Sequence, residues 1–235
     1  MQTSSPALRL GLAAAFAVLL VSGRPGAQQT PVKVPQPGVP QIMTLEGEFI
    51  RIAYNNEGYV SLGYRVANES VGQEWMMMDV GMTIRAGQPM YKLTRSSISV
   101  ETPEGKKIPL ATNGEYLNVD LRKLEQRALT NPDEIGYFPP EASDKPCRIS
   151  MFAATGSPTR AFDDVDLQSN RGCLGRLYFH IPGGIKYGQH WLNVQFKGSL
   201  VRVPFRILTK DEEKQLSKTW KDVKKQVEAA FKKGK

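Results

Sequence analysis

Residues 191–207 read WLNVQFKGSLVRVPFRI, two apolar–polar alternations joined at Gly198-Ser199. A period of two residues is typical of a β-strand with one buried face and one solvated face. Glycine at the first central position suits a two-residue type II′ turn, because it reaches positive φ without a Cβ clash. The stretch therefore predicts a β-hairpin.

The predicted hairpin has a register that can be checked. A loop at residues 198–199 places three apolar pairs on one face, Phe196–Val201, Val194–Val203 and Leu192–Phe205. A slip of one residue would instead bury Arg202 and Arg206. Pro204 falls on the opposite face and lacks an N–H, which predicts a strand at a sheet edge or a local gap in the ladder.

Short strand-like segments separated by turns precede the hairpin. They occupy residues 49–54, 59–67, 75–84, 96–100, 107–110, 148–152 and 176–181. Such a series is typical of a β-sandwich. Tyr187-Gly188, just before the hairpin, resembles the tyrosine corner of immunoglobulin-like sandwiches, in which a Tyr hydroxyl bonds upstream backbone. The sequence thus predicts a mostly β protein, an antiparallel immunoglobulin-like β-sandwich over residues 44–208.

The first residues have the pattern of an export signal. Arg9 is the only charge before an apolar run at residues 10–21, and small residues and Pro25 follow. We interpret residues 1–27 as a signal peptide, with a retained membrane anchor as the alternative. Four prolines in residues 28–43 predict an extended linker. The expected location is exported, either periplasmic or extracellular.

Two cysteines, Cys147 and Cys173, are consistent with an oxidising compartment and predict one disulfide. The loop between them has about 25 residues, which corresponds to about 3 kcal/mol of stabilisation in the chain-entropy model. Two free thiols are the alternative, which export disfavours.

The formal net charge is +8, and loss of Arg9 and Arg24 with the signal leaves +6. Nine lysines against five acids give the tail at residues 209–235 a charge of +4, so residues 28–208 are nearly balanced. A body without a basic stripe argues against nucleic-acid binding.

Residues 118–145 interrupt the strand pattern. Leu121, Leu124 and Ala128 predict a short amphipathic helix that ends at Asn131-Pro132. Tyr137 and Phe138, followed by two prolines, form a candidate partner-binding surface, because loops on a rigid scaffold often carry binding. The alternative is a crossover that covers the end of the core.

The tail at residues 209–235 is predicted to be an amphipathic basic helix. Thr209 and Glu212 have the spacing of a capping box. One apolar stripe follows, consisting of Leu216, Trp220, Val223, Val227 and Phe231. The stripe is expected to pack on its own domain or to bind a partner protein. Contact with a membrane surface ranks third, because anionic lipid would repel the acidic first turn.

The strand at residues 75–84 carries methionines on one face. Thioether sulfur is a soft ligand that suits copper(I), but a methionine-filled core strand explains Met76, Met78 and Met82 better. Met77 points to the other face and predicts a second buried face or a binding patch.

Residues 169–174, Ser-Asn-Arg-Gly-Cys-Leu, resemble the segment around the nucleophilic cysteine of L,D-transpeptidases, exported enzymes that act on peptidoglycan. The resemblance implies that Cys173 is a nucleophile, which needs a base for activation. Arg171 stands where that family has a histidine, and His180 and His190 both follow the cysteine. A structural disulfide therefore explains Cys173 better.

The metal-binding patterns are incomplete. Asp163, Asp164, Asp166 and Asn170 have oxygens at spacings that suit calcium, but the EF-hand pattern fails at the third ligand and at the required glycine. His180 and His190 have no definite third ligand for zinc. No cofactor and no metal are predicted.

These observations predict a non-enzymatic binding or interaction module of the cell envelope, with an unknown protein or envelope component as its partner. One alternative is an envelope enzyme that uses Cys173. Another is a carbohydrate-binding module, suggested by aromatic side chains on strand faces, Trp75, Tyr178 and Trp191. The sequence specifies neither the ligand nor the oligomeric state.

Overall fold

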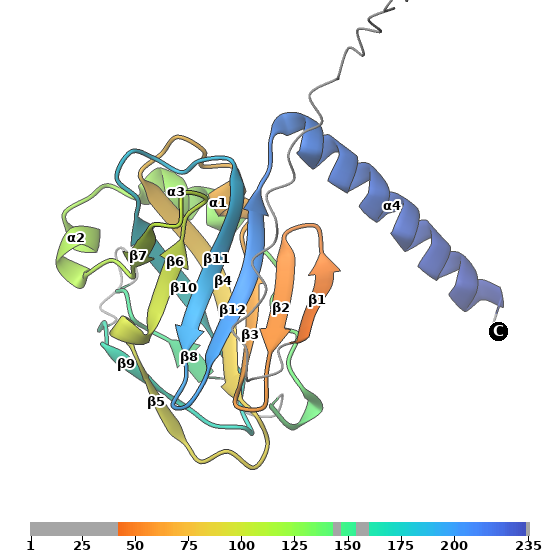
Figure 1. The fold of residues 1–235 in the computed structure, drawn as a ribbon. Helices are drawn as coiled ribbons and strands as arrows, with labels where there is room; N and C mark the ends of the chain where they lie inside the picture. The colour runs from red at the N-terminus through yellow and green to blue at the C-terminus, as the bar shows by residue number, and fades with distance from the viewer. Residues whose placement is uncertain (1–41, 143–146, 154–159, 234–235) are drawn as a thin grey trace, which may run out of the picture. The chain divides into compact units, whose positions relative to one another are not determined.

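The structure, a computed structural model, describes residues 42–142, 147–153 and 160–233. These residues are mostly β and form three sheets (Figure 1). The six-stranded sheet has the order β1 (Ile42–Gly47), β2 (Ile50–Tyr54), β3 (Gly58–Gly63), β4 (Trp75–Ile84), β10 (Cys173–His180) and β8 (Cys147–Ile149). The four-stranded sheet has the order β12 (Leu200–Ile207), β11 (Gly188–Gln195), β6 (Ile98–Glu101) and β7 (Lys107–Pro109). β5 (Tyr91–Thr94) and β9 (Asp164–Leu167) pair separately.

The hairpin of β11 and β12 exists, but its predicted turn is wrong. Val194 faces Val201 rather than Val203, so residues 196–199 form a four-residue loop. Because the register differs by two residues, the predicted apolar face is still buried. The Glu57 carboxylate explains the longer loop, since it accepts the N–H of Gly198 at 2.9 Å and also binds the Ser199 hydroxyl. β12 is an edge strand, as Pro204 predicted.

One hydrophobic core lies between the two larger sheets. Val60, Leu62 and the predicted face of β4 contribute from one sheet, and Leu192, Val194 and Phe205 contribute from the other. Met76, Met78 and Met82 are fully buried there, which confirms the core interpretation of the methionine strand. Burial of each such side chain stabilises the fold by roughly 1.5–3 kcal/mol.

A second hydrophobic cluster covers the opposite face of the six-stranded sheet. Met77 of β4 and Tyr178 of β10 pack there against side chains from α1 (Arg65–Asn68), α2 (Asn113–Leu117) and α3 (Arg122–Thr130). The predicted second buried face is thus confirmed, as is the helix with Leu121, Leu124 and Ala128 buried. The predicted insertion begins too late, because α2 already starts at Asn113. The sequence pattern that marks the start of α2 is the capping box of Thr112 and Glu115.

Three local predictions need correction. Residues 65–68 form α1 instead of extending the strand, because Asp133, far along the chain, accepts the N–H of Arg65 at 2.9 Å. Ile42 and Met43 belong to β1 rather than to the linker. Tyr187 is 50% exposed, so it does not form a buried tyrosine corner.

β8 and β10 contradict a purely antiparallel fold, since they pair in parallel. The disulfide Cys147–Cys173 joins these two strands, as predicted from the cysteine count. The segment between β8 and β10 contains β9. An η1 turn (Arg95–Ser97) and an η2 turn (Pro140–Ala142) complete the part of the domain that the structure describes.

α4 (Lys210–Lys233) follows β12 directly, and the predicted capping box is present. The Thr209 N–H donates to the Glu212 carboxylate at 2.9 Å, and the Glu212 N–H donates to the Thr209 hydroxyl at 3.3 Å. Asn68 holds the junction, because its side-chain oxygen accepts the Leu208 N–H at 2.6 Å. Within the described ranges, no helix is both long enough and apolar enough to span a membrane. The predicted signal peptide and nearly all of the linker lie outside the described residues.

Candidate functional site

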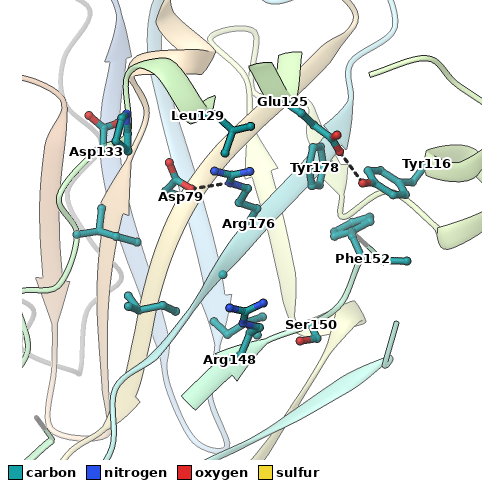
Figure 2. Close-up of a pocket in the computed structure, with 16 residues that line it drawn as sticks. Asp79, Tyr116, Glu125, Leu129, Asp133, Arg148, Ser150, Phe152, Arg176 and Tyr178 are labelled. Atoms are coloured by element: carbon teal, nitrogen blue, oxygen red, sulfur yellow. Dashed lines mark hydrogen bonds and ion pairs between the residues drawn. The ribbon is translucent and has the colours of Figure 1, made fainter. Parts of the chain in front are cut away.

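A cavity of about 590 Å³ lies on the outward face of the six-stranded sheet (Figure 2). The strand period explains its floor. Ile149, Cys173 and Leu177 point into the main core, so the alternate residues Arg148 of β8 and Arg176 of β10 point outward. α3 and the segment that follows it line the other side with Glu125, Leu129, Pro132, Asp133 and Ile135.

Close strand packing shapes the floor beside the disulfide. A Cβ on Gly175 would lie 2.4 Å from the backbone oxygen of Ile149, so only glycine lets β8 approach β10 this closely. Arg148 on β8 and Leu174 on β10 lie directly opposite one another, one residue beyond the paired cysteines. The disulfide therefore ties together two strands that line the cavity.

An ion pair lies in the floor. Arg176 and Asp79 are opposite one another on β10 and β4, and the Arg176 Nε donates to an Asp79 oxygen at 3.2 Å (Figure 2). Burial raises the pKa of Asp79 above its usual value, and the neighbouring Arg176 opposes that shift. The Arg176 side chain is 33% exposed, so the pair is accessible from the cavity.

An aromatic cluster forms one wall. Tyr116, Phe152 and Tyr178 lie with their ring centroids 4.9–5.1 Å apart in tilted and edge-on arrangements. The Tyr116 hydroxyl donates to Glu125 at 2.8 Å, which links the wall to α3. Burial, together with Tyr116 and Glu125, raises the pKa of the Tyr178 hydroxyl, which is therefore neutral at physiological pH.

Asp133 supports the wall opposite the aromatic cluster. Its carboxylate accepts the backbone N–H of Arg65 and lies 3.3 Å from the Arg65 Nε. Burial is the main cause that raises the pKa of Asp133 to about 6, and nearby Asp79 raises it further. Asp133 thus positions α1 against the segment that lines the cavity.

The predicted surface at residues 137–140 is packed on the sheet in part and exposed in part. Phe138 rests on Gly172 and Gly81, where an added Cβ would lie 2.4 Å and 2.8 Å from its ring. The Tyr59 hydroxyl donates to the Tyr137 carbonyl at 2.7 Å, and the Tyr137 side chain is 40% exposed. This segment therefore covers the sheet through Phe138, while Tyr137 and Pro140 are exposed.

The predicted stripe of α4 is open where the structure describes its side chains. Leu216 and Trp220 are half-buried and Val223 is 40% exposed. The side chains of Val227 and Phe231 lie outside the described part. The stripe and the cavity are separate features, so the candidate binding residues do not come together in one site.

The remaining candidates have structural partners. Cys173 is fully buried and disulfide-bonded, so its sulfur is not a thiolate in this structure. Asp163 pairs with Arg95, and Lys92 pairs with both Asp164 and Asp166. Within the described ranges no three acidic, histidine or cysteine side chains gather as a metal site.

The aromatic side chains proposed for carbohydrate binding do not form a platform. Trp75 stacks on His180, with ring centroids 5.3 Å apart, and Tyr178 is buried in the cavity wall. Trp191 is 3% exposed on the other sheet, beneath the Arg202 guanidinium.

Sequence reasoning missed Asp79, Arg176, Arg148 and Asp133 as site residues. A signal existed, because Asp79 and Arg176 are charges in strands that are otherwise apolar. Their pairing could not be found, since 97 residues separate them.

In comparisons with known proteins, no protein-family model, no curated protein and no solved structure matches the chain.

Proposed function

We propose that the chain is an exported, non-enzymatic binding module of the cell envelope, periplasmic or extracellular, that holds a small ligand in the cavity over β4, β10 and β8. The observation that carries the proposal is the cavity itself. Its volume of about 590 Å³ is in the range of small-molecule sites. It combines apolar and aromatic walls with a few charged groups, which is the composition of such sites.

The chemistry of the cavity favours binding over catalysis. Its carboxylates are engaged, Asp79 with Arg176, Glu125 with Tyr116 and Asp133 with Arg65. A nucleophilic site needs a base within hydrogen-bond reach of a hydroxyl or thiol that it can deprotonate. The thiol of Cys173 is in the disulfide, which weighs against the alternative of an enzyme that uses it.

The immunoglobulin-like classification also remains a proposal. A shared core between two β-sheets supports a sandwich. The predicted antiparallel sandwich does not account for the parallel pairing of β8 with β10.

A fragment screen with a blocked cavity tests the proposed function. Leu129 is 66% exposed in the cavity wall, so Leu129→Trp should fill the mouth with little effect on the core. Leu117→Trp is the matched control, since Leu117 is 68% exposed and does not line the cavity. In ¹⁹F NMR with fluorinated fragments, we expect signals that broaden with the native protein and with Leu117→Trp, but not with Leu129→Trp. Identical spectra for all three proteins would reject the cavity as a binding site.

A further inference from the structure

The two arginines of the cavity floor have hydrogen-bonding groups to spare. Arg176 uses its Nε for Asp79, and its two Nη groups meet no acceptor among the described residues. Arg148 is exposed and, within the same ranges, its side chain makes no hydrogen bond or ion pair. The lining carboxylates, in contrast, all accept hydrogen bonds from protein donors. The arginine N–H donors of the floor are therefore available to a ligand that supplies hydrogen-bond acceptors.

Arg148 and Arg176 can act together. Arg148 on β8 lies opposite Leu174 on β10. Arg176 follows Leu174 by two residues on β10, so the two arginines are diagonal neighbours on one face of the sheet. Neighbouring strands lie about 4.8 Å apart and each residue advances about 3.3 Å, so diagonal neighbours lie roughly 8 Å apart, which long side chains can bridge. Figure 2 shows both side chains on the same side of the two strands. Asp79 holds the Arg176 guanidinium, and a planar guanidinium binds a carboxylate through two parallel hydrogen bonds.

Apolar side chains lie beside this pair, together with the engaged carboxylates of the cavity. Leu174, beside both arginines, is 40% exposed, and Leu129 on α3 is also exposed. Tyr178, two residues after Arg176, brings the aromatic cluster to the same floor. A ligand that fits must therefore present an anionic group to the arginines and an apolar group to this wall.

We propose that the cavity binds a small organic anion, a carboxylate attached to an aromatic or aliphatic group, with Arg148 and Arg176 as its anion-binding residues. This inference rests on the proposed function and adds the chemical class of the ligand. A charge-assisted hydrogen bond that is lost reduces affinity by roughly tenfold or more.

Three matched probes test the ligand class, namely 3-phenylpropionate, its neutral amide 3-phenylpropionamide and the cation 3-phenylpropylammonium. Titrations of the ¹⁵N-labelled protein at low ionic strength should show the carboxylate binding at least tenfold more tightly than the amide or the amine. Arg176→Gln and Arg148→Gln should each weaken carboxylate binding by about tenfold or more. Arg206→Gln makes the same charge change on β12, outside the cavity, and should leave the affinity unchanged.

The outcomes separate the two proposals. If the amide or the amine binds as tightly as the carboxylate and Leu129→Trp abolishes that binding, the cavity is a ligand site but the anion inference is wrong. If carboxylate binding survives both arginine substitutions, the inference is also wrong. If none of the probes binds, the anion inference fails, and the proposed function is then judged by the fragment screen alone.

Discussion

Asp133 is a carboxylate placed where burial opposes its charge. Its side chain is 3% exposed, and even with Arg65 beside it, burial raises its pKa to about 6. The folded state therefore holds this proton more tightly than the unfolded chain, whose aspartates titrate near pH 3.9. Stability contributed by the protonated group is present below pH 4 and is lost as the pH rises to about 6.

Asp133→Asn should remove this pH dependence, because the amide oxygen can still accept the Arg65 N–H. The free energy of unfolding of the variant, relative to that of the native protein, should increase by on the order of 3 kcal/mol between pH 4 and pH 6.5. Urea unfolding of both proteins across this pH range measures the difference. Parallel pH profiles would contradict the raised pKa.

At the scale of elements, α4 makes few contacts with the rest of the domain among the described residues. Arg206 pairs with Glu212 at 2.7 Å, and the first turn is capped by Thr209. From Lys214 to Gln226 no described side chain is buried. Most helix stability in proteins comes from packing an apolar face, so this helix contributes little to the domain unless its stripe is covered. The junction before it is different, because Asn68 fixes Leu208.

Deletion of residues 214–235 should lower the melting temperature by less than about 2 °C, since it removes no buried side chain that the structure describes. Asn68→Ala in the full chain should cost roughly 1–3 kcal/mol, because the half-buried Leu208 N–H loses its acceptor. Calorimetry of both variants gives the comparison. A drop of 8 °C or more on deletion would instead show that the stripe packs on its own domain.

At the scale of the whole molecule, the disulfide joins the two strands whose inner faces lie in the core and whose outer faces line the cavity. Cys147 and Cys173 join an edge strand of three residues, β8, to the long strand β10. Three paired positions give β8 few backbone contacts of its own. The covalent link therefore holds in place the strand that carries Arg148.

The native protein should not react with iodoacetamide, and it should take up two labels after denaturation and reduction, as read by intact mass. Replacing both cysteines with alanine should lower the free energy of unfolding by about 3 kcal/mol. Rapid alkylation of Cys173 at neutral pH without reductant would contradict this prediction. It would favour the alternative of an enzyme that uses this thiol.

Local patterns in the sequence were enough for several elements. Alternation in residues 75–84 placed the methionines in the core and Met77 on the other face, and Thr209 with Glu212 marked the start of α4. The period of a strand is a local property, so one register slip of two residues in the hairpin left its buried face unchanged.

Only the tertiary structure decided the candidate site. Asp79 meets Arg176, Asp133 meets Arg65, and Phe138 meets Gly172 because β4, β10 and the segment after α3 come together from distant parts of the chain. Alternation tells which face of a strand is buried, but it does not tell which strand lies beside it. The same limit explains residues 65–67, where a strand-like pattern gave way to a helix once a remote carboxylate could bind its first N–H. The sequence by itself thus determined most of the strands and their buried faces, although β1, β5 and β9 were missed. The cavity and its charged floor depend on strand pairing, which is set by the packing of the whole chain.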